Sequence, residues 1–167
     1  MNYLAATIQK YRSKGIIVDT NLLILYFVGG FDISYIEKFQ RVKNKGYTKE
    51  DYEALVRLLS CFDRLLVTPH IIAEVSNLSF KDETSSGFVG YFKSVMDLLL
   101  KADEQYIHKD ILLRMPHCAK FGFTDMSIVE FAQQEDLPVI TDDFKLHGLL
   151  TNAGVASINM DVIRALA

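Results

Sequence analysis

The chain has 167 residues, half of them apolar and 23% charged, which is typical of a globular protein and excludes a disordered one. A chain of this length is expected to form one domain, residues 1–167, whose core needs neither disulfides nor a structural metal. The net charge of −3 is not that of a general nucleic-acid binder. If several of the acids were neutralised by a bound metal, however, the positive and negative charges of the other residues would nearly balance.

The apolar runs of the sequence are too short to span a membrane. The longest, from Leu22 to Val28, has seven residues, whereas a spanning helix needs about 18 or more. The first ten residues lack a basic segment followed by an apolar core, so no secretory signal is expected. Cys61 and Cys118 form no CxxC pair and lie within apolar patterns, as buried thiols in a reducing compartment do. These features predict a cytoplasmic protein without membrane contact.

The first part of the chain predicts a helix, a buried strand and a second helix. Residues 3–14 have apolar positions at helical spacing and form an extra N-terminal helix. Ile16-Ile17-Val18 predicts a strand buried on both faces, as in a parallel sheet. An apolar helix follows, with a stop signal at Gly29-Gly30.

A helical insertion is expected over residues 31–62. Its first helix is predicted from Asp32 to Gln40, and its last begins at Thr48, which with Asp51 resembles a capping box. Between them lies a basic stretch around Tyr47 that includes Arg41, Lys43 and Lys45. Such a stretch is either a solvated loop or, beside a nuclease site, a segment that holds the phosphate backbone of RNA.

Strands and helices alternate in the remainder of the chain. Strands are expected at residues 65–68, 105–108, 138–141 and 155–158, and a polar loop at 81–87. Helices are expected at residues 69–78, 88–101, 111–115, 144–150 and 160–167, and another introduced by Thr124. This alternation predicts a three-layer α/β fold with a parallel sheet.

Acidic residues recur where strands end and helices begin. Asp19 follows the first strand, Glu74 lies early in the helix after the second, Asp125 is near a helix start, and Asp142 and Asp143 follow a later strand. Each of them has a structural explanation, because an acid in a first helical turn complements the helix dipole. The carboxyl ends of parallel strands meet at one edge of a sheet, so their shared placement predicts a cluster there.

Clustered carboxylates predict a site for a divalent cation. Several of them cannot stay ionised together unless cations neutralise their charge. All-carboxylate ligation suits Mg²⁺ or Mn²⁺ rather than Zn²⁺, and an open site of this kind suits phosphodiester hydrolysis by a metal-activated water. His70 and Glu74, four residues apart, offer a weaker transition-metal alternative. No Gly-rich phosphate loop follows the first strand.

Four segments resemble the PIN domain, the nuclease domain of VapC-type toxins and of several RNA-processing proteins. They are Ile-Ile-Val-Asp-Thr-Asn-Leu-Leu at 16–23, Glu74 after a strand and Thr-Pro, Phe-Thr-Asp at 123–125, and Val-Ile-Thr-Asp-Asp-Phe at 139–144. The resemblance runs from about Gly15 to Met160. Each motif is short, and the specificity lies in their order and spacing.

The resemblance implies a PIN-like α/β/α fold, with a five-strand parallel sheet in the order 3-2-1-4-5, and a Mg²⁺- or Mn²⁺-dependent endoribonuclease. The matching catalytic and metal-binding acids are Asp19, Glu74, Asp125 and Asp143. The family's last motif usually reads Thr-x-Asp, which favours Asp143 over Asp142, although Asp142 stays a further candidate ligand. Asn21 and Thr141 match positions that support the acids through hydrogen bonds.

The implied partners are an RNA substrate, the antitoxin protein of a type II toxin–antitoxin pair, and a second copy of the chain. The helix at 3–14 and the insertion at 31–62 depart from a minimal toxin. Arg41, Lys43 and Lys45 are the candidate RNA-binding residues. A PIN-like module that binds RNA or protein without catalysis is the alternative function.

Overall fold

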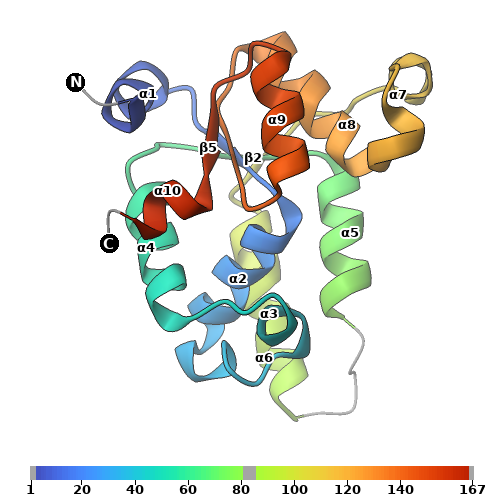
Figure 1. Ribbon diagram of the computed structural model, residues 1–167. Coiled ribbons are helices and arrows are strands. Elements are labelled where there is room, and N and C mark those ends of the chain that lie inside the picture. Colours follow the sequence, from blue (N-terminus) through green and yellow to red (C-terminus); the bar gives the residue numbers. More distant parts are fainter. Residues whose placement is uncertain (1–2, 81–85, 166–167) are drawn as a thin grey trace.

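The computed structural model describes residues 3–80 and 86–165. A parallel sheet in the order β3-β2-β1-β4-β5 crosses its centre (Figure 1). The strands are β1 (Ile16–Val18), β2 (Leu65–Val67), β3 (Asp103–Glu104), β4 (Val139–Thr141) and β5 (Ser157–Asn159). Helices flank the sheet in a three-layer α/β/α arrangement, so the predicted fold class and strand order are confirmed.

The helices follow the predicted alternation with the strands. They are α1 (Tyr3–Tyr11), α2 (Thr20–Phe31), the 3-10 turn η1 (Ile33–Tyr35), α3 (Gln40–Asn44), α4 (Lys49–Leu59), α5 (Pro69–Ser79), α6 (Ser86–Leu99), α7 (Lys109–Arg114), α8 (Cys118–Glu135), α9 (Phe144–Asn152) and α10 (Met160–Arg164). None of the helices in these described segments is long and apolar enough to cross a membrane.

The central strand and the helix after it form the middle of the core. Every residue of β1 is buried, because β2 and β4 pair with it on either side and helices cover both faces. Helix α2 packs against α4, α5 and α6, so its apolar residues are buried on more than one side. The buried pair β1–α2 therefore fixes the point where Asp19 leaves the sheet.

The predicted helix starts in the insertion and after β2 are confirmed. Thr48 and Asp51 form a reciprocal capping box at the start of α4. Thr68 caps α5 by accepting a hydrogen bond from the Ile71 N–H, and Pro69 takes the first helical position.

Two predictions around the end of α2 are wrong. The helix runs through Gly29-Gly30 to Phe31, because Gly29 allows α4 to approach closely: a Cβ there would lie 2.3 Å from Cδ2 of Tyr52. The helix expected from Asp32 to Gln40 is reduced to η1. Asp32 has extended backbone and accepts a hydrogen bond from the Ser34 N–H, a local alternative to continuing a helix.

The strand predicted at residues 105–108 is also wrong, since β3 lies at Asp103–Glu104. The short β2 offers only Leu66 and Val67 as partners, and Ile107 turns into the core instead. Helix α8 spans Cys118–Glu135, but non-helical backbone at Gly122 (φ 85°, ψ 174°) divides it into two helices. The second of them begins directly after Gly122, so the helix predicted to be introduced by Thr124 is confirmed.

Smaller differences concern the thiols and the chain segments beyond the description. Cys61 and Cys118 are half-buried free thiols rather than fully buried ones. Residues 81–85 of the predicted loop, and 166–167 of the last predicted helix, lie outside the described residues.

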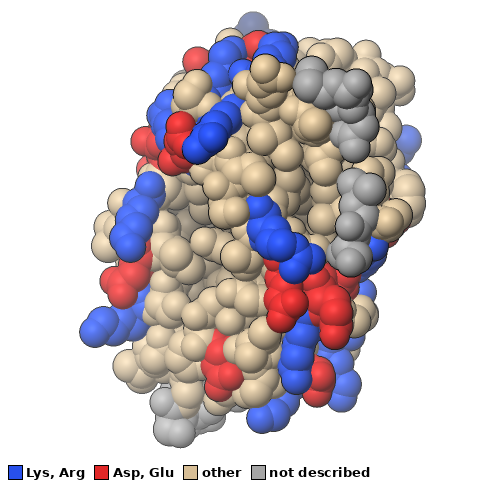
Figure 2. Space-filling model, turned by 90° about the vertical axis from the view of Figure 1, so that its left-hand side faces the viewer, with Lys and Arg blue, Asp and Glu red and all other residues tan. Residues whose placement is uncertain are grey.

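The surface shown in Figure 2 carries charged residues of both signs around a broad area without charge. Among the residues drawn in colour, no continuous basic stripe crosses that face. Nucleic-acid binding there would lack the electrostatic attraction that a row of lysines and arginines supplies.

Candidate active site

Four of the predicted acids line one pocket of about 260 Å³ at the carboxyl end of the central strands: Asp19, Glu74, Asp125 and Asp143. They come from four separate segments, namely the end of β1, α5, α8 and the start of α9. Thr20, Asn21 and residues 121–124 complete the wall. The parallel sheet thus brings together side chains that are more than 120 residues apart in the sequence.

Asp19 occupies the N-cap position of α2 without acting as a cap. Its side chain makes no capping hydrogen bond. One carboxylate oxygen instead accepts a 2.7 Å hydrogen bond from the Thr141 hydroxyl, and the residue is only 5% exposed. Thr141 therefore supports Asp19 as predicted, and its hydroxyl also accepts a hydrogen bond from the Asp143 N–H. The structural explanation of Asp19 as a helix cap does not hold.

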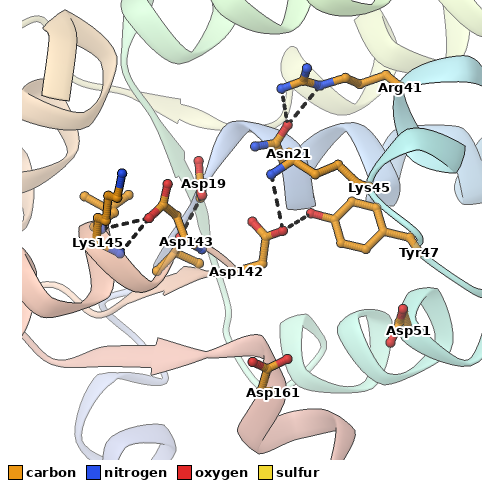
Figure 3. Close-up of polar contacts among 12 residues, drawn as sticks. Asp19, Asn21, Arg41, Lys45, Tyr47, Asp51, Asp142, Asp143, Lys145 and Asp161 are labelled. Atoms are coloured by element: carbon orange, nitrogen blue, oxygen red, sulfur yellow. Dashed lines mark hydrogen bonds and ion pairs between the residues drawn. The ribbon is translucent and has the colours of Figure 1, made fainter.

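Asp143 does cap a helix. Its Oδ1 accepts hydrogen bonds from the N–H groups of Lys145 and Leu146, at 2.7 and 3.1 Å, at the start of α9 (Figure 3). These bonds fix the orientation of the carboxylate, and both use the same oxygen. The second oxygen, Oδ2, takes no part in the capping. Asp143 can therefore serve the helix and a ligand together.

Thr20 lines the pocket and Ser127 is buried behind it, although the sequence analysis assigned neither residue to the site. The Thr20 hydroxyl donates to Glu74 at 3.1 Å and so orients the carboxylate from α5. The Ser127 hydroxyl donates to the Thr124 carbonyl and lies 2.8 Å from the Thr68 hydroxyl, which ties α8 to the start of α5. The position of Thr20 directly after Asp19 was the one feature of the sequence that could have indicated its role. The contact of Ser127 with Thr68 joins residues that are distant in the sequence, so no local pattern indicates it.

Burial and mutual repulsion disfavour the ionised forms of two of these acids. Burial raises the pKa of Asp19 to about 6, with contributions from Asp142 and Glu74, against the hydrogen bond from Thr141. Burial also raises the pKa of Asp125 to about 7, with further contributions from Asp19, Asp143 and Glu74. The pocket is therefore a place where added positive charge would be favourable.

Asp142 points away from the pocket. Its Oδ2 accepts a hydrogen bond from the Tyr47 hydroxyl and lies 3.7 Å from Nζ of Lys45 (Figure 3). Its Oδ1 is buried without a hydrogen-bond partner among the described residues. The structure thus separates the two adjacent acids, with Asp143 lining the pocket and Asp142 joined to the basic stretch of the insertion.

Asn21 lines the pocket but its side-chain oxygen serves Arg41 rather than an acid. The guanidinium of Arg41 donates two hydrogen bonds to Asn21 Oδ1, at 3.1 and 2.8 Å (Figure 3). Asn21 was predicted to form a hydrogen bond that supports one of the acids. In the structure its Oδ1 instead holds the Arg41 guanidinium cation. Of the other candidate RNA-binding residues, Lys43 and Lys45 are both exposed.

The donor set fits a hard divalent cation, although the side chains are not gathered around one point. Within residues 3–80 and 86–165, no group of three His, Cys, Asp or Glu side chains is arranged to hold a metal ion as it stands. The pocket nevertheless offers four carboxylates and no nitrogen or sulfur ligand. Oxygen-only donors favour Mg²⁺ or Mn²⁺.

Compared with models of known protein families and with curated proteins, the chain matches none of them. Its function has to be inferred from its own residues.

Proposed function

We propose that the protein is a metal-dependent endoribonuclease of the PIN type, hydrolysing RNA phosphodiester bonds. The observation that carries this proposal is the convergence of four carboxylates from four separate segments on one pocket. The burial of Asp19 and Asp125, and the repulsion that both receive from the neighbouring acids, create a demand for a cation that a set of ordinary helix caps would not have. The parallel sheet in the order 3-2-1-4-5, which the family also has, supports the same conclusion.

In this proposal Asp19 and Asp143 are the principal metal ligands, and Glu74 and Asp125 complete the site. When bound there, Mg²⁺ or Mn²⁺ supplies positive charge and Lewis acidity for hydrolysis of the phosphodiester. Thr141 keeps an oxygen of Asp19 in place, and Thr20 does the same for Glu74. These hydrogen bonds reduce the rearrangement that binding requires.

The basic stretch of the insertion holds the RNA backbone in this proposal. The two bonds from Arg41 to Asn21 fix a guanidinium beside the pocket, where its remaining N–H groups can donate to a phosphate. Lys43 and Lys45 add exposed positive charge on the same segment.

We further propose that the protein acts in the cytoplasm as the toxin of a type II toxin–antitoxin pair and forms a homodimer. The exposed apolar side chains of Tyr106, Ile111 and Leu113 offer a surface for an antitoxin or a second copy.

The substitution Asp19→Asn tests the nuclease proposal. It keeps the shape of the side chain and removes one charge, so cleavage of single-stranded RNA by the Mg²⁺- or Mn²⁺-loaded protein should be abolished while the fold is retained. Asp97→Asn, at an exposed position on α6, is the control and should cleave as the unchanged protein does. Cleavage that survives Asp19→Asn, or that survives EDTA, would show that the proposed metal site is not responsible.

A PIN-like binding module without catalysis is the second candidate function. It is favoured by the finding that no three His, Cys, Asp or Glu side chains among the described residues are already arranged to hold a metal ion. A metal titration followed by thermal unfolding separates the two. The nuclease proposal expects Mg²⁺ or Mn²⁺ to raise the unfolding temperature of the unchanged protein but not that of Asp19→Asn. No effect of either metal, together with no cleavage of any RNA, would favour the binding module.

A further inference from the structure

A second cavity, of about 620 Å³, lies between η1, α3, the end of α5 and the start of α6. Four aromatic side chains contribute to its lining, namely Tyr35, Phe39, Phe88 and Tyr91, and we call it the aromatic groove. The rings of Phe39 and Tyr91 contact each other with centroids 5.3 Å apart. Its volume is within the range of about 300–1,000 Å³ typical of small-molecule sites.

The rim of the aromatic groove is polar and positively charged. Gln40 and Asn44 lie one turn apart on α3 and are joined by a 2.6 Å hydrogen bond between their amides. Lys38 lies over the Tyr35 ring at 5.7 Å from its centroid, and Arg41 also lines the groove. Aromatic faces beside amide groups and cations are the combination with which proteins hold unpaired nucleobases.

Tyr91 forms the buried wall of the aromatic groove. The residue is 4% exposed, and its ring also contacts those of Phe31 and Phe80, with centroids 6.0 and 6.2 Å apart. Its hydroxyl is buried beside Ser79, whose hydroxyl donates to the Val75 carbonyl.

The aromatic groove adjoins the pocket of carboxylates at two points. Arg41 lines the groove and donates to Asn21, which lines the pocket. On α5, Glu74 faces the pocket and Leu78, four residues later, lines the groove. Residues at this spacing share one face of a helix about 6 Å apart, which is close to one nucleotide step along a strand.

We propose that the aromatic groove binds one nucleobase of the RNA next to the bond that is cleaved, and that Gln40 and Asn44 select its identity. This inference rests on the proposed nuclease function and adds a base preference to it. The base would stack on the aromatic side chains, and its edge would bond to the amides of α3. The positive rim suits the phosphates on either side of that base.

Binding of the four nucleoside 5′-monophosphates tests the proposal without any cleavage. Each is added to the full chain in EDTA, and chemical shifts in ¹⁵N-labelled protein report where it binds. We expect at least one nucleotide to shift the backbone resonance of Gly87 and the side-chain amides of Gln40 and Asn44, which all line the groove. The variant Gln40→Ala with Asn44→Ala should bind that nucleotide roughly tenfold more weakly.

The matched control is Gln134→Ala. Gln134 makes an equivalent exposed amide contact with Glu130, at 2.7 Å one turn away on α8, and its variant should bind nucleotides as the unchanged protein does. No groove shifts with any nucleotide at millimolar concentration, or equal binding by the double variant, would overturn the proposal. Groove shifts that appear only with an added protein would also overturn it, because the groove would then be a protein-docking surface.

Sequencing the products of a random RNA pool then separates this inference from the nuclease function. A preferred base beside the cut that disappears in the double variant supports both. An unchanged preference overturns the inference and leaves the nuclease function standing. Groove binding without any RNA cleavage supports the nucleotide site and overturns the nuclease function.

Discussion

Asp19 and Asp125 give the metal-free protein an unusual response to pH. Their pKa values of about 6 and about 7 are raised above the ordinary value of an aspartate. Between the unfolded and the folded pKa, the folded protein holds more protons than the unfolded chain, so its stability falls as the pH rises through this window. In EDTA, we expect these two groups to make the free energy of unfolding lower at pH 8 than at pH 5.

A comparison of variants isolates this effect from other titrating groups. Urea unfolding at pH 5 and pH 8 is measured for the unchanged protein and for the double variant Asp19→Asn with Asp125→Asn. The double variant should gain stability at both pH values, because pH 5 already lies above the unfolded pKa of an aspartate, and the gain should be larger at pH 8 by on the order of a few kcal/mol. An equal gain at both pH values would mean that folding does not raise the pKa values of these two carboxyls.

Thr141 gives a second residue-level prediction. Its buried hydroxyl donates to Asp19 and accepts from the Asp143 N–H, so it joins two of the acids. Thr141→Val keeps the shape but removes both bonds, which should lower the free energy of unfolding by about 1–3 kcal/mol and weaken metal binding. Thr141→Ser retains the hydroxyl and should keep the metal affinity. Calorimetric titration with Mn²⁺ measures this difference, and equal affinities of both variants would contradict the role of the hydroxyl.

At the level of the helix, the two functions of Asp143 can be separated. Asn can still cap α9 through its side-chain oxygen but lacks the charge, whereas Ala can do neither. Asp143→Asn should therefore lose metal binding and keep most of the stability, and Asp143→Ala should lose about 1 kcal/mol as well. Thermal unfolding and metal titration of both variants check this. Full metal affinity in Asp143→Asn would remove Asp143 from the ligand set.

The main elements were predictable because each depends on neighbours in the sequence. The apolar residues of β1, the cap at Thr68-Pro69 and the capping box at Thr48 all followed from local patterns. Gly29 was misread because a glycine that ends a helix and one that admits Tyr52 look alike in the sequence. The aromatic groove was missed for a similar reason, since its lining comes from α3, α5 and α6 together.

The candidate site was predictable to the extent that it follows from the topology. Parallel strands place their carboxyl ends at one edge, which brings Asp19 and Asp143 together, and Glu74 and Asp125 reach the same pocket from helices α5 and α8. The direction of a side chain depends on tertiary partners instead. Tyr47 and Lys45 hold Asp142 outside the pocket, and Arg41 takes the oxygen of Asn21.

For the whole molecule, a net charge of −3 means that RNA binding has to depend on a local group of cations. Replacing Arg41, Lys43 and Lys45 by Ala should weaken binding to single-stranded RNA and reduce the slope of log affinity against log salt by about 0.7 for each phosphate that the protein no longer neutralises. The control replaces Lys93, Lys101 and Lys109, three exposed lysines on other segments, and has the same net charge. Fluorescence anisotropy over a salt series gives the slope, and identical slopes for the two variants would assign the basic stretch to the solvated surface.

The central position of β1 also has a consequence for the order of events in folding. Asp19 and Glu74 belong to the first half of the chain, and Asp125 and Asp143 to the second, so the complete set of four forms only when β4 pairs with β1. Closing loops of this length costs entropy before such contacts form, so we expect the repulsion between the acids to act on the finished structure more than on the steps before it. With the proposed metal bound, the gain in stability would appear as slower unfolding, while the rate of folding would change little. The cation would therefore prolong the lifetime of the folded state of a chain that folds without it.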